Sequence, residues 1–141
     1  MKINIDITQQ EIVETFELFD DWMDRYQYLI DIGKQLPQLD PGEMTDDNLV
    51  SGCQSQVWLV ASGSSEKLTF RANSDAAIVS GLIALLLQIY SGHSAAEILD
   101  SKPWFVEKIG LADHLSLTRA NGLASMLAKI RGYAQMVDNN S

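Results

Sequence analysis

The chain is poor in cysteine: Cys53 is the only one among its 141 residues. One thiol cannot form a disulfide within the chain, so nothing in the sequence points to an oxidising compartment. A zinc site needs three or four Cys, His or carboxylate ligands at compact spacing. Beyond Cys53 the chain offers only two histidines, His93 and His114, which we place at helix ends on the surface. We therefore expect no bound metal.

Basic residues are also scarce, with 10 Lys and Arg against 19 Asp and Glu and a formal net charge of -9. A field of this sign repels nucleic-acid phosphates and anionic lipid, so we expect neither a nucleic acid nor a membrane as partner. The acidic excess favours a partner with a basic surface. Taken alone, however, the negative charge is better explained as one that simply keeps the protein soluble.

Hydrophobic runs long enough to cross a membrane are missing as well. The most apolar stretch, "AAIVSGLIALLLQIY", is too short to span a bilayer and is typical of a buried helix. The first residues, "MKINIDITQQE", lack the apolar segment of a signal peptide. With 46% hydrophobic and 21% charged residues, we expect a single cytoplasmic domain over residues 1–141.

The first part of the chain predicts one long helix. Thr8 and Glu11 form a capping box that opens this helix near Gln9, and Gly33 with Pro37 ends it. The apolar residues at helical spacing, which we assign to the core, are Ile12, Phe16, Phe19, Trp22, Met23, Tyr26, Leu29 and Ile30.

The segments on either side of this helix are expected to be non-helical. Ile3, Ile5 and Ile7 alternate with polar residues, which allows a short edge strand or an extended arm. Residues 35–52 are rich in proline, glycine and acidic residues and predict a long loop. Loops of this length in compact domains are usually functional or disordered.

A β-hairpin is predicted next. "QVWLVAS" (56–62) and "KLTFRAN" (67–73) are β-branched and aromatic, and the turn-rich "GSSE" separates them. The side chains expected to face the core are Val57, Leu59 and Ala61 on one strand and Leu68, Phe70 and Ala72 on the other.

From Ser74 onward the pattern is helical. One helix, capped by Ser74 or Asp75, should run to about Tyr90, and Gly92 stops it. Ser94 and Glu97 form a capping box for a short helix reaching Asp100.

Two more helices are expected, one in "PWFVEKI" beginning near Pro103 and ending at Gly110, and one capped by Thr118. The inner stripe of the last helix should be Leu123, Met126, Leu127, Ile130, Tyr133 and Val137. A helix, a hairpin and then helices indicate an α+β fold, in which helices cover one side of a small antiparallel sheet of about three strands.

The residues alone allow three interpretations of the single thiol. Free cysteine is often a small buried hydrophobe. A cysteine hydrolase would pair Cys53 with His93 or His114, but neither histidine lies in a recognisable motif. The third interpretation is a sulfur carrier. Gly52 gives the backbone next to Cys53 conformational freedom, and backbone N–H groups near a loop can stabilise a sulfur anion. The sequence contains no phosphate-binding or dinucleotide-binding motif.

Five segments in order resemble the SufE family of sulfur acceptors. They are "YQYLIDIGKQLP" (26–37), "GCQSQVWLV" (52–60), "SDAAIVSGLIALLLQIYSG" (74–92), "KPWFVEKIGLADHLS" (102–116) and "LSLTRANGLASMLAKIR" (115–131). This resemblance implies helices on one side of a small antiparallel sheet, a fold shared with iron–sulfur scaffolds of the IscU type. Scaffold function itself does not fit, because a cluster needs several thiolate ligands and this chain has one cysteine.

The resemblance also implies a function. Cys53 would take persulfide sulfur from a SufS-like or CsdA-like cysteine desulfurase, stimulate that enzyme and pass the sulfur to an iron–sulfur assembly scaffold. The chain would act as a sulfur-transfer partner rather than a stand-alone enzyme, as a monomer or homodimer. It would need no cofactor of its own, since pyridoxal phosphate belongs to the desulfurase. Two alternatives stay open: a paralogous carrier that feeds a tRNA-modification pathway, and a regulator that carries no sulfur.

The same resemblance singles out residues around the thiol. Arg119, in "TRANG", matches the family's characteristic arginine and either contacts an anion, the loop or the partner, or is a surface residue of a first helical turn. Asp75 either contacts the partner or caps a helix. Gln54 and Gln56 are expected to orient the loop around Gly52 and Cys53, or to pair with backbone.

Overall fold

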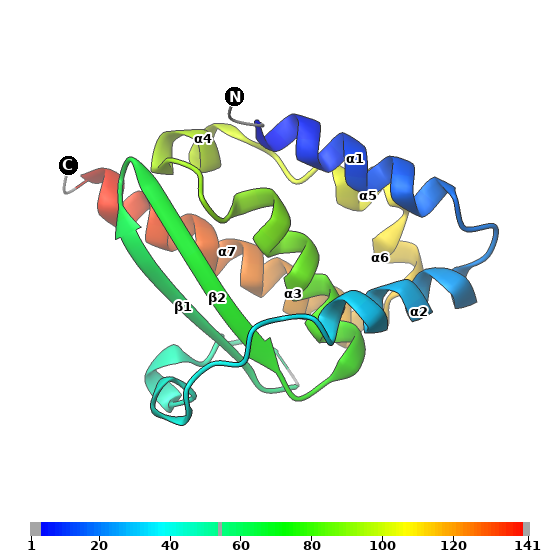
Figure 1. The fold of residues 1–141 in the computed structure, drawn as a ribbon, viewed down its shortest axis with the longest axis horizontal. Helices are drawn as coiled ribbons and strands as arrows, with labels where there is room; N and C mark the ends of the chain where they lie inside the picture. Colours follow the sequence, from blue (N-terminus) through cyan, green and yellow to red (C-terminus); the bar gives the residue numbers. More distant parts are fainter. Residues whose placement is uncertain (1–3, 54, 140–141) are drawn as a thin grey trace.

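The computed structural model describes residues 4–53 and 55–139 and places the helices on one side of a β-hairpin (Figure 1). Its elements are α1 (Ile5–Glu17), α2 (Trp22–Gly33), the 3-10 turns η1 (Pro41–Glu43) and η2 (Asp46–Asn48), β1 (Val57–Ser64), β2 (Lys67–Ser74), α3 (Ala77–Tyr90), α4 (Ala95–Asp100), α5 (Phe105–Ile109), α6 (Leu111–His114) and α7 (Leu117–Asn139). The predicted α+β class is confirmed. The four-residue helix α6 was not predicted.

The sheet of the described residues has two strands rather than about three. β1 and β2 pair antiparallel, with Val57 opposite Ser74 and Ser64 opposite Lys67. The third strand or arm expected near the N-terminus is wrong for Ile5 and Ile7, which begin α1; Ile3 lies outside the described residues. The side chain of Asn4 caps this helix by accepting a hydrogen bond from the Ile7 backbone N–H, at 2.8 Å. The helix therefore begins before the predicted Thr8–Glu11 capping box. The strand prediction failed because an alternating pattern of three isoleucines is too short to exclude a helix.

The single long helix predicted after Gln9 is also wrong, because the chain breaks between α1 and α2. Asp21 caps α2 by accepting a hydrogen bond from the Asp24 backbone N–H at 2.9 Å. Arg25 donates to the carbonyl of Phe19 and holds the connection against the start of α2. The apolar residues keep their helical spacing across this break, so the sequence pattern did not reveal it. Met23, assigned to the core, is 79% exposed.

α2 and α3 cross where two glycines, Gly33 and Gly81, face each other. A Cβ on Gly33 would lie 2.6 Å from the backbone nitrogen of Gly81, and a Cβ on Gly81 would lie 2.2 Å from the Leu29 carbonyl oxygen. Only glycine permits so close an approach of the two backbones. The crossing fixes the position of α3, which contributes to the site described below.

The inner face of the hairpin packs on α3 and α7. Val57, Leu59, Leu68, Phe70 and Ala72 are buried as predicted, whereas Ala61 is only partly buried. In α7, the predicted stripe is buried at Leu123, Met126 and Ile130 and partly buried at Leu127, Tyr133 and Val137. The core thus joins the hairpin to both helices, and helices cover one face of the sheet as expected.

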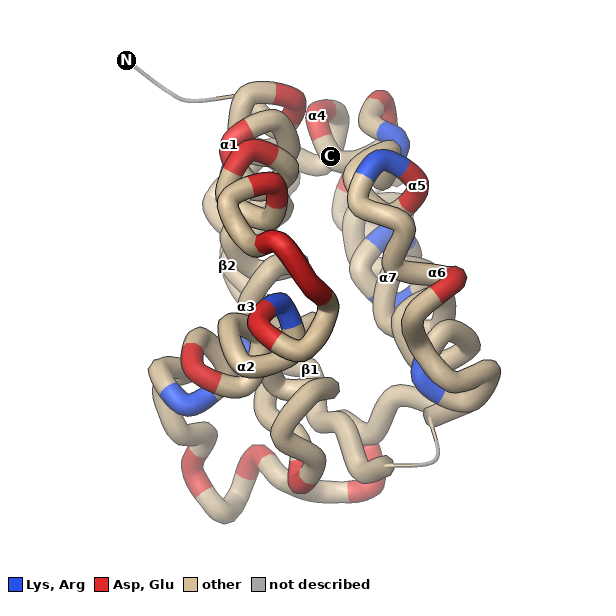
Figure 2. The backbone as a smooth tube through the Cα atoms, turned by 90° about the vertical axis from the view of Figure 1, so that its right-hand side faces the viewer, with Lys and Arg blue, Asp and Glu red and all other residues tan. Residues whose placement is uncertain are grey.

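Charge is unevenly distributed over the elements. Figure 2 shows acidic residues along α1, on its connection to α2 and in the loop before β1, whereas basic residues occur along α7. Helix α7 has three basic residues, Arg119, Lys129 and Arg131, and one acidic residue, Asp138. Helix α7 therefore carries more basic than acidic residues, unlike the chain as a whole.

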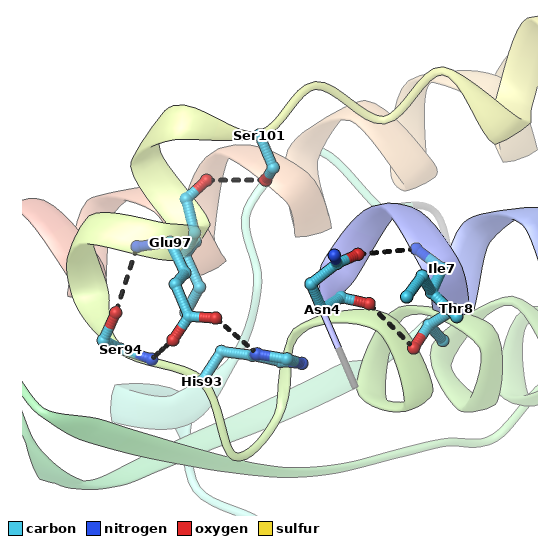
Figure 3. A network of polar contacts seen from close by, with 8 residues as sticks. Asn4, Ile7, Thr8, His93, Ser94, Glu97 and Ser101 are labelled. Carbon is cyan, nitrogen blue, oxygen red and sulfur yellow. Dashed lines mark hydrogen bonds and ion pairs between the residues drawn. The ribbon is translucent and has the colours of Figure 1, made fainter. Parts of the chain in front are cut away.

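The capping box predicted for α4 is confirmed (Figure 3). Ser94 Oγ accepts from the Glu97 backbone N–H at 3.1 Å, and Glu97 accepts from the Ser94 backbone N–H at 3.1 Å. The carboxylate of Glu97 also contacts Nδ1 of His93 at 3.2 Å, and this histidine is buried rather than on the surface as predicted. At the other end of α4, the guanidinium of Arg131 donates to the carbonyls of Ile98, Leu99 and Ser101 and ties α4 to α7.

The helix predicted to end at Gly110 does so, since Gly110 closes α5 at a φ of 83°. The long loop before β1 is ordered by contacts with the hairpin. Asn73 accepts a hydrogen bond from the Leu39 backbone N–H at 2.6 Å, and Arg71 forms an ion pair with Glu43. Among the described residues, no helix has both the length and the hydropathy needed to cross a membrane.

Candidate functional site

Cys53 lies in the turn between η2 and β1, and this turn rests on α7. Gly52 has a φ of 88°, a left-handed conformation that favours glycine. A Cβ on Gly52 would lie 2.4 Å from Ser125 Oγ on α7. The glycine before Cys53 therefore provides both the turn and the close approach to the helix, which places the thiol near one end of the hairpin.

The thiol of Cys53 points to the backbone of α7. Its Sγ lies 3.7 Å from the carbonyl oxygen of Gly122 and donates a weak hydrogen bond to it. A Cβ on Gly122 would lie 3.5 Å from Sγ, an ordinary van der Waals distance, so the sulfur packs directly against this part of the helix backbone. Cys53 is half-buried, and this burial raises the pKa of its thiol above the ordinary cysteine value.

This environment differs from the expected one, in which backbone N–H groups stabilise a thiolate. A carbonyl oxygen accepts a hydrogen bond from a thiol but repels a sulfur anion, and burial also disfavours the anion. The surroundings of Cys53 thus favour the thiol over the thiolate, and the thiol is the less nucleophilic form.

A pocket of about 240 Å³ opens beside the sulfur, and we call it the Cys53 pocket. Its apolar lining is contributed by Val79 and Leu82 of α3 and Met126 of α7. Its polar lining is contributed by Ser55, Ser116, Thr118 and Arg119, and Gly122 completes it next to Cys53. The pocket therefore combines a thiol, hydroxyl groups and one guanidinium over an apolar base.

Arg119 reaches this pocket from the first turn of α7. The helix begins at Leu117, and Ser116 Oγ accepts a hydrogen bond from the Arg119 backbone N–H at 3.2 Å. Ser116 therefore performs the capping role predicted for Thr118. Arg119 is exposed, and within the described residues its guanidinium forms no hydrogen bond or ion pair with the protein.

Asp75 and Gln56 lie together at the open end of the hairpin. Asp75 Oδ1 accepts from the Gln56 backbone N–H at 3.0 Å, and the Asp75 backbone N–H donates to the Gln56 carbonyl at 3.3 Å. Asp75 does not cap α3, whose N-cap residue is Ala76. Its role in this structure is to fix the end of the turn that carries Cys53. Both contacts are made by the main chain of Gln56, so the role expected of its side chain stays a prediction.

The structure brings Cys53 and Arg119 to one pocket, with Gly52 at its edge, and keeps Asp75 and Gln56 at the base of the turn. Gln54 lies outside the described residues. The contributions of Val79, Leu82, Ser116, Gly122 and Met126 were not predicted as part of the site. Their sequence signals indicate only helix caps and core packing, since α3 and α7 meet at Cys53 through tertiary structure alone.

Neither histidine lines the Cys53 pocket within the part of the chain that is described. His93 is buried against Glu97, and the exposed His114 stacks on Trp22 with ring centroids 4.0 Å apart. The Cys–His pair considered from the sequence therefore has no geometric support. The described residues also contain no group of three or more Cys, His, Asp or Glu side chains arranged to bind a metal ion.

Comparison with known proteins identifies the family of this chain. The model of the SufE family, described as an Fe-S metabolism associated domain, matches residues 10–134. An uncharacterized SufE-like protein of Rhizobium meliloti (strain 1021) is 48% identical over 131 residues, which is 89% of this chain and 93% of that protein. A second uncharacterized SufE-like protein, from Rhizobium etli, is 48% identical over 132 residues, covering 89% of this chain and 88% of that protein.

Among solved structures, the solution structure of a hypothetical protein from Thermus thermophilus is similar, with a TM-score of 0.75. It covers 94% of this chain and 96% of its own, at 21% sequence identity, and at that identity the likeness concerns the fold alone. The family model and the relatives together connect the chain to Fe–S metabolism. With a family match that includes Cys53, Asp75 and Arg119, this protein belongs to the SufE family.

Proposed function

We propose that this protein is a sulfur carrier, which takes persulfide sulfur from a pyridoxal-phosphate-dependent cysteine desulfurase onto Cys53. It stimulates the desulfurase by unloading it and delivers the sulfur to iron–sulfur cluster assembly. It acts as one half of a transfer reaction and needs no cofactor of its own. The observation that carries the proposal is the single thiol of a SufE-family chain, which faces a pocket with room for additional sulfur.

The proposed chemistry is one thiol–persulfide exchange. The thiolate of Cys53 attacks the terminal sulfur of the persulfide on the desulfurase, and a new S–S bond forms. The bond between that terminal sulfur and the desulfurase thiol breaks, and the desulfurase thiolate leaves. One sulfur atom moves without a net oxidant or reductant.

The sulfur-free site favours the thiol of Cys53 rather than the thiolate that attacks the persulfide. Burial and the Gly122 carbonyl favour the protonated thiol, so docking has to change the environment of Cys53 before it reacts. Two pivots flank the thiol: Gly52 before it, and the Asp75–Gln56 pairs after it. A change confined to the turn between them would move the sulfur and leave the hairpin intact.

Two alternatives are separated by experiment. Incubation with a desulfurase and cysteine, followed by intact-protein mass spectrometry without reductant, should show one added sulfur that is lost in Cys53→Ser. A regulator that carries no sulfur would stimulate the desulfurase without this adduct, and Cys53→Ser would stimulate it equally. A carrier for tRNA modification would gain the adduct but transfer it to a different acceptor, which a labelled-sulfur assay with both acceptors distinguishes.

A further inference from the structure

The Cys53 pocket is much larger than its proposed cargo. A cavity of about 10–15 Å³ is enough to hold one water molecule, whereas this pocket measures about 240 Å³. One sulfur atom added to Cys53 would therefore leave most of it free. The remaining space is large enough for a small organic molecule beside the persulfide.

The polar groups of the pocket define the charge of such a molecule. Arg119 is its only Lys or Arg, and no carboxylate lines it within the described residues. Within the same residues the guanidinium has no protein partner, so its hydrogen bonds are available to a ligand. The hydroxyls of Ser55 and Thr118 add donors that also act as acceptors. The pocket is thus built for an anion, in a protein whose net charge of -9 otherwise repels anions.

The remaining lining defines the rest of the molecule. Val79, Leu82 and Met126 offer an apolar surface of the kind that packs against methylene groups. An ammonium group would meet hydroxyls and Arg119 but no carboxylate. A short chain with a carboxylate at one end and no ammonium matches these features better than a zwitterionic amino acid.

We infer that the Cys53 pocket binds a short thiol acid, whose carboxylate contacts Arg119 and whose thiol discharges the persulfide of Cys53. This rests on the proposed function for the origin of the persulfide. The thiolate of the acid attacks the terminal sulfur and forms a new S–S bond. The bond from that sulfur to Sγ breaks, and Cys53 leaves as a thiolate that takes a proton from water. The product is the persulfide of the thiol acid, and no external oxidant or reductant is involved.

The test uses two thiols of equal length and different charge. The full-length protein is loaded with sulfur by inorganic polysulfide, and the loss of its persulfide is followed by mass spectrometry with 3-mercaptopropionate or with neutral 3-mercaptopropanol. Rates are compared per thiolate, because reactivity depends on thiol basicity. We expect 3-mercaptopropionate to react roughly tenfold faster, as one charge-assisted contact to an exposed arginine allows, and its rate to saturate with concentration.

Arg119→Gln should remove this preference, by slowing the reaction with 3-mercaptopropionate to the rate of the neutral thiol. Lys108→Gln, a matched loss of charge at an exposed residue of α5, should keep the preference. Propionate, which has no thiol, should compete with 3-mercaptopropionate in the wild type alone. Equal rates for the two thiols, or a preference that survives Arg119→Gln, would overturn the inference.

Loading with polysulfide makes the test independent of the desulfurase. If the preference is found but a desulfurase does not load Cys53, the pocket assignment stands and the proposed function fails. If a desulfurase loads Cys53 but the two thiols react alike, the proposed function stands and the pocket assignment fails.

Discussion

The thiol of Cys53 donates a hydrogen bond to the backbone carbonyl of Gly122, with the sulfur 3.7 Å from that oxygen. The contact joins the turn before β1 to the N-terminal part of α7 without any side chain from the helix. It depends on Gly52, which has a φ of 88° and brings the chain close to Ser125 of the same helix. Gly52 thus helps to determine where the sulfur of Cys53 lies.

Gly52→Ala should destabilise the protein by about 1–3 kcal/mol, because alanine is strained at a φ of 88° and its Cβ meets Ser125 Oγ. Urea unfolding followed by circular dichroism measures the change in the free energy of unfolding. Gly42→Ala, where nothing lies within 4 Å of the new Cβ, is the control and should be nearly neutral. Equal stability of the two variants would show that the turn does not depend on Gly52.

The raised pKa of Cys53 predicts slow alkylation of the folded protein at neutral pH, because the thiolate is the reactive form. The rate should rise with pH through a midpoint above that of the same thiol in the urea-unfolded chain. A midpoint at or below the unfolded value would contradict the burial of the thiol.

The raised pKa of Cys53 also predicts how the stability of the folded protein changes with pH. A group whose pKa is raised by folding stabilises the folded state below its unfolded pKa, and this contribution is lost as the pH rises through the folded value. Wild type should therefore lose stability at alkaline pH relative to Cys53→Ser. The difference in unfolding free energy between the two proteins, measured across alkaline pH, checks this expectation.

Local signals predicted much of the fold. The hairpin, the Ser94–Glu97 box and the end of α5 at Gly110 follow from turn, cap and β-branched residues next to one another in sequence. The break before α2 was missed because an apolar stripe continued through it, although Asp21 is a good N-cap residue. The place of Cys53 near the hairpin end was predictable, but its pocket was not.

The pocket could not be predicted because its lining depends on the crossing of separate helices. Val79 and Leu82 are predicted core residues of a buried helix, and nothing local shows that they face Cys53. Gly122 is likewise an ordinary helical residue until the turn lies against it. Family resemblance selected Arg119 as a residue around the thiol, which sequence spacing alone could not do, and in the structure both line one pocket.

The crossing of α2 and α3 gives a prediction on the fold. Gly81→Ala should cost about 1–3 kcal/mol, because the new Cβ would lie 2.2 Å from the Leu29 carbonyl oxygen. Gly132→Ala, also in a helix but with open space around the new Cβ, should stabilise the protein by up to about 1 kcal/mol. Thermal and urea unfolding of both variants measure the change in the free energy of unfolding. A change in the same direction for both variants would contradict the close crossing of the two helices.

Docking of the desulfurase should involve the rim of the Cys53 pocket. Leu117 is 79% exposed at the start of α7, close in sequence to the pocket residue Arg119. Leu117→Ser and Arg119→Ala should each raise the concentration needed for half-maximal desulfurase stimulation about fivefold, the loss expected for one interface contact of about 1 kcal/mol.

Met136→Ser is the matched control for this footprint, since Met136 is 55% exposed at the other end of α7. It should leave both docking and sulfur transfer unchanged. Weaker docking by Met136→Ser than by Leu117→Ser would move the footprint away from the pocket.

The most direct test of the sulfur carrier is the mass of the protein after turnover with its desulfurase. Wild type, incubated with the desulfurase and cysteine and analysed without reductant, should gain one sulfur atom on the peptide that contains Cys53. Cys53→Ser should gain none, keep the circular dichroism spectrum of the wild type, and fail to stimulate the desulfurase. An unmodified Cys53, together with full stimulation by Cys53→Ser, would contradict the carrier mechanism.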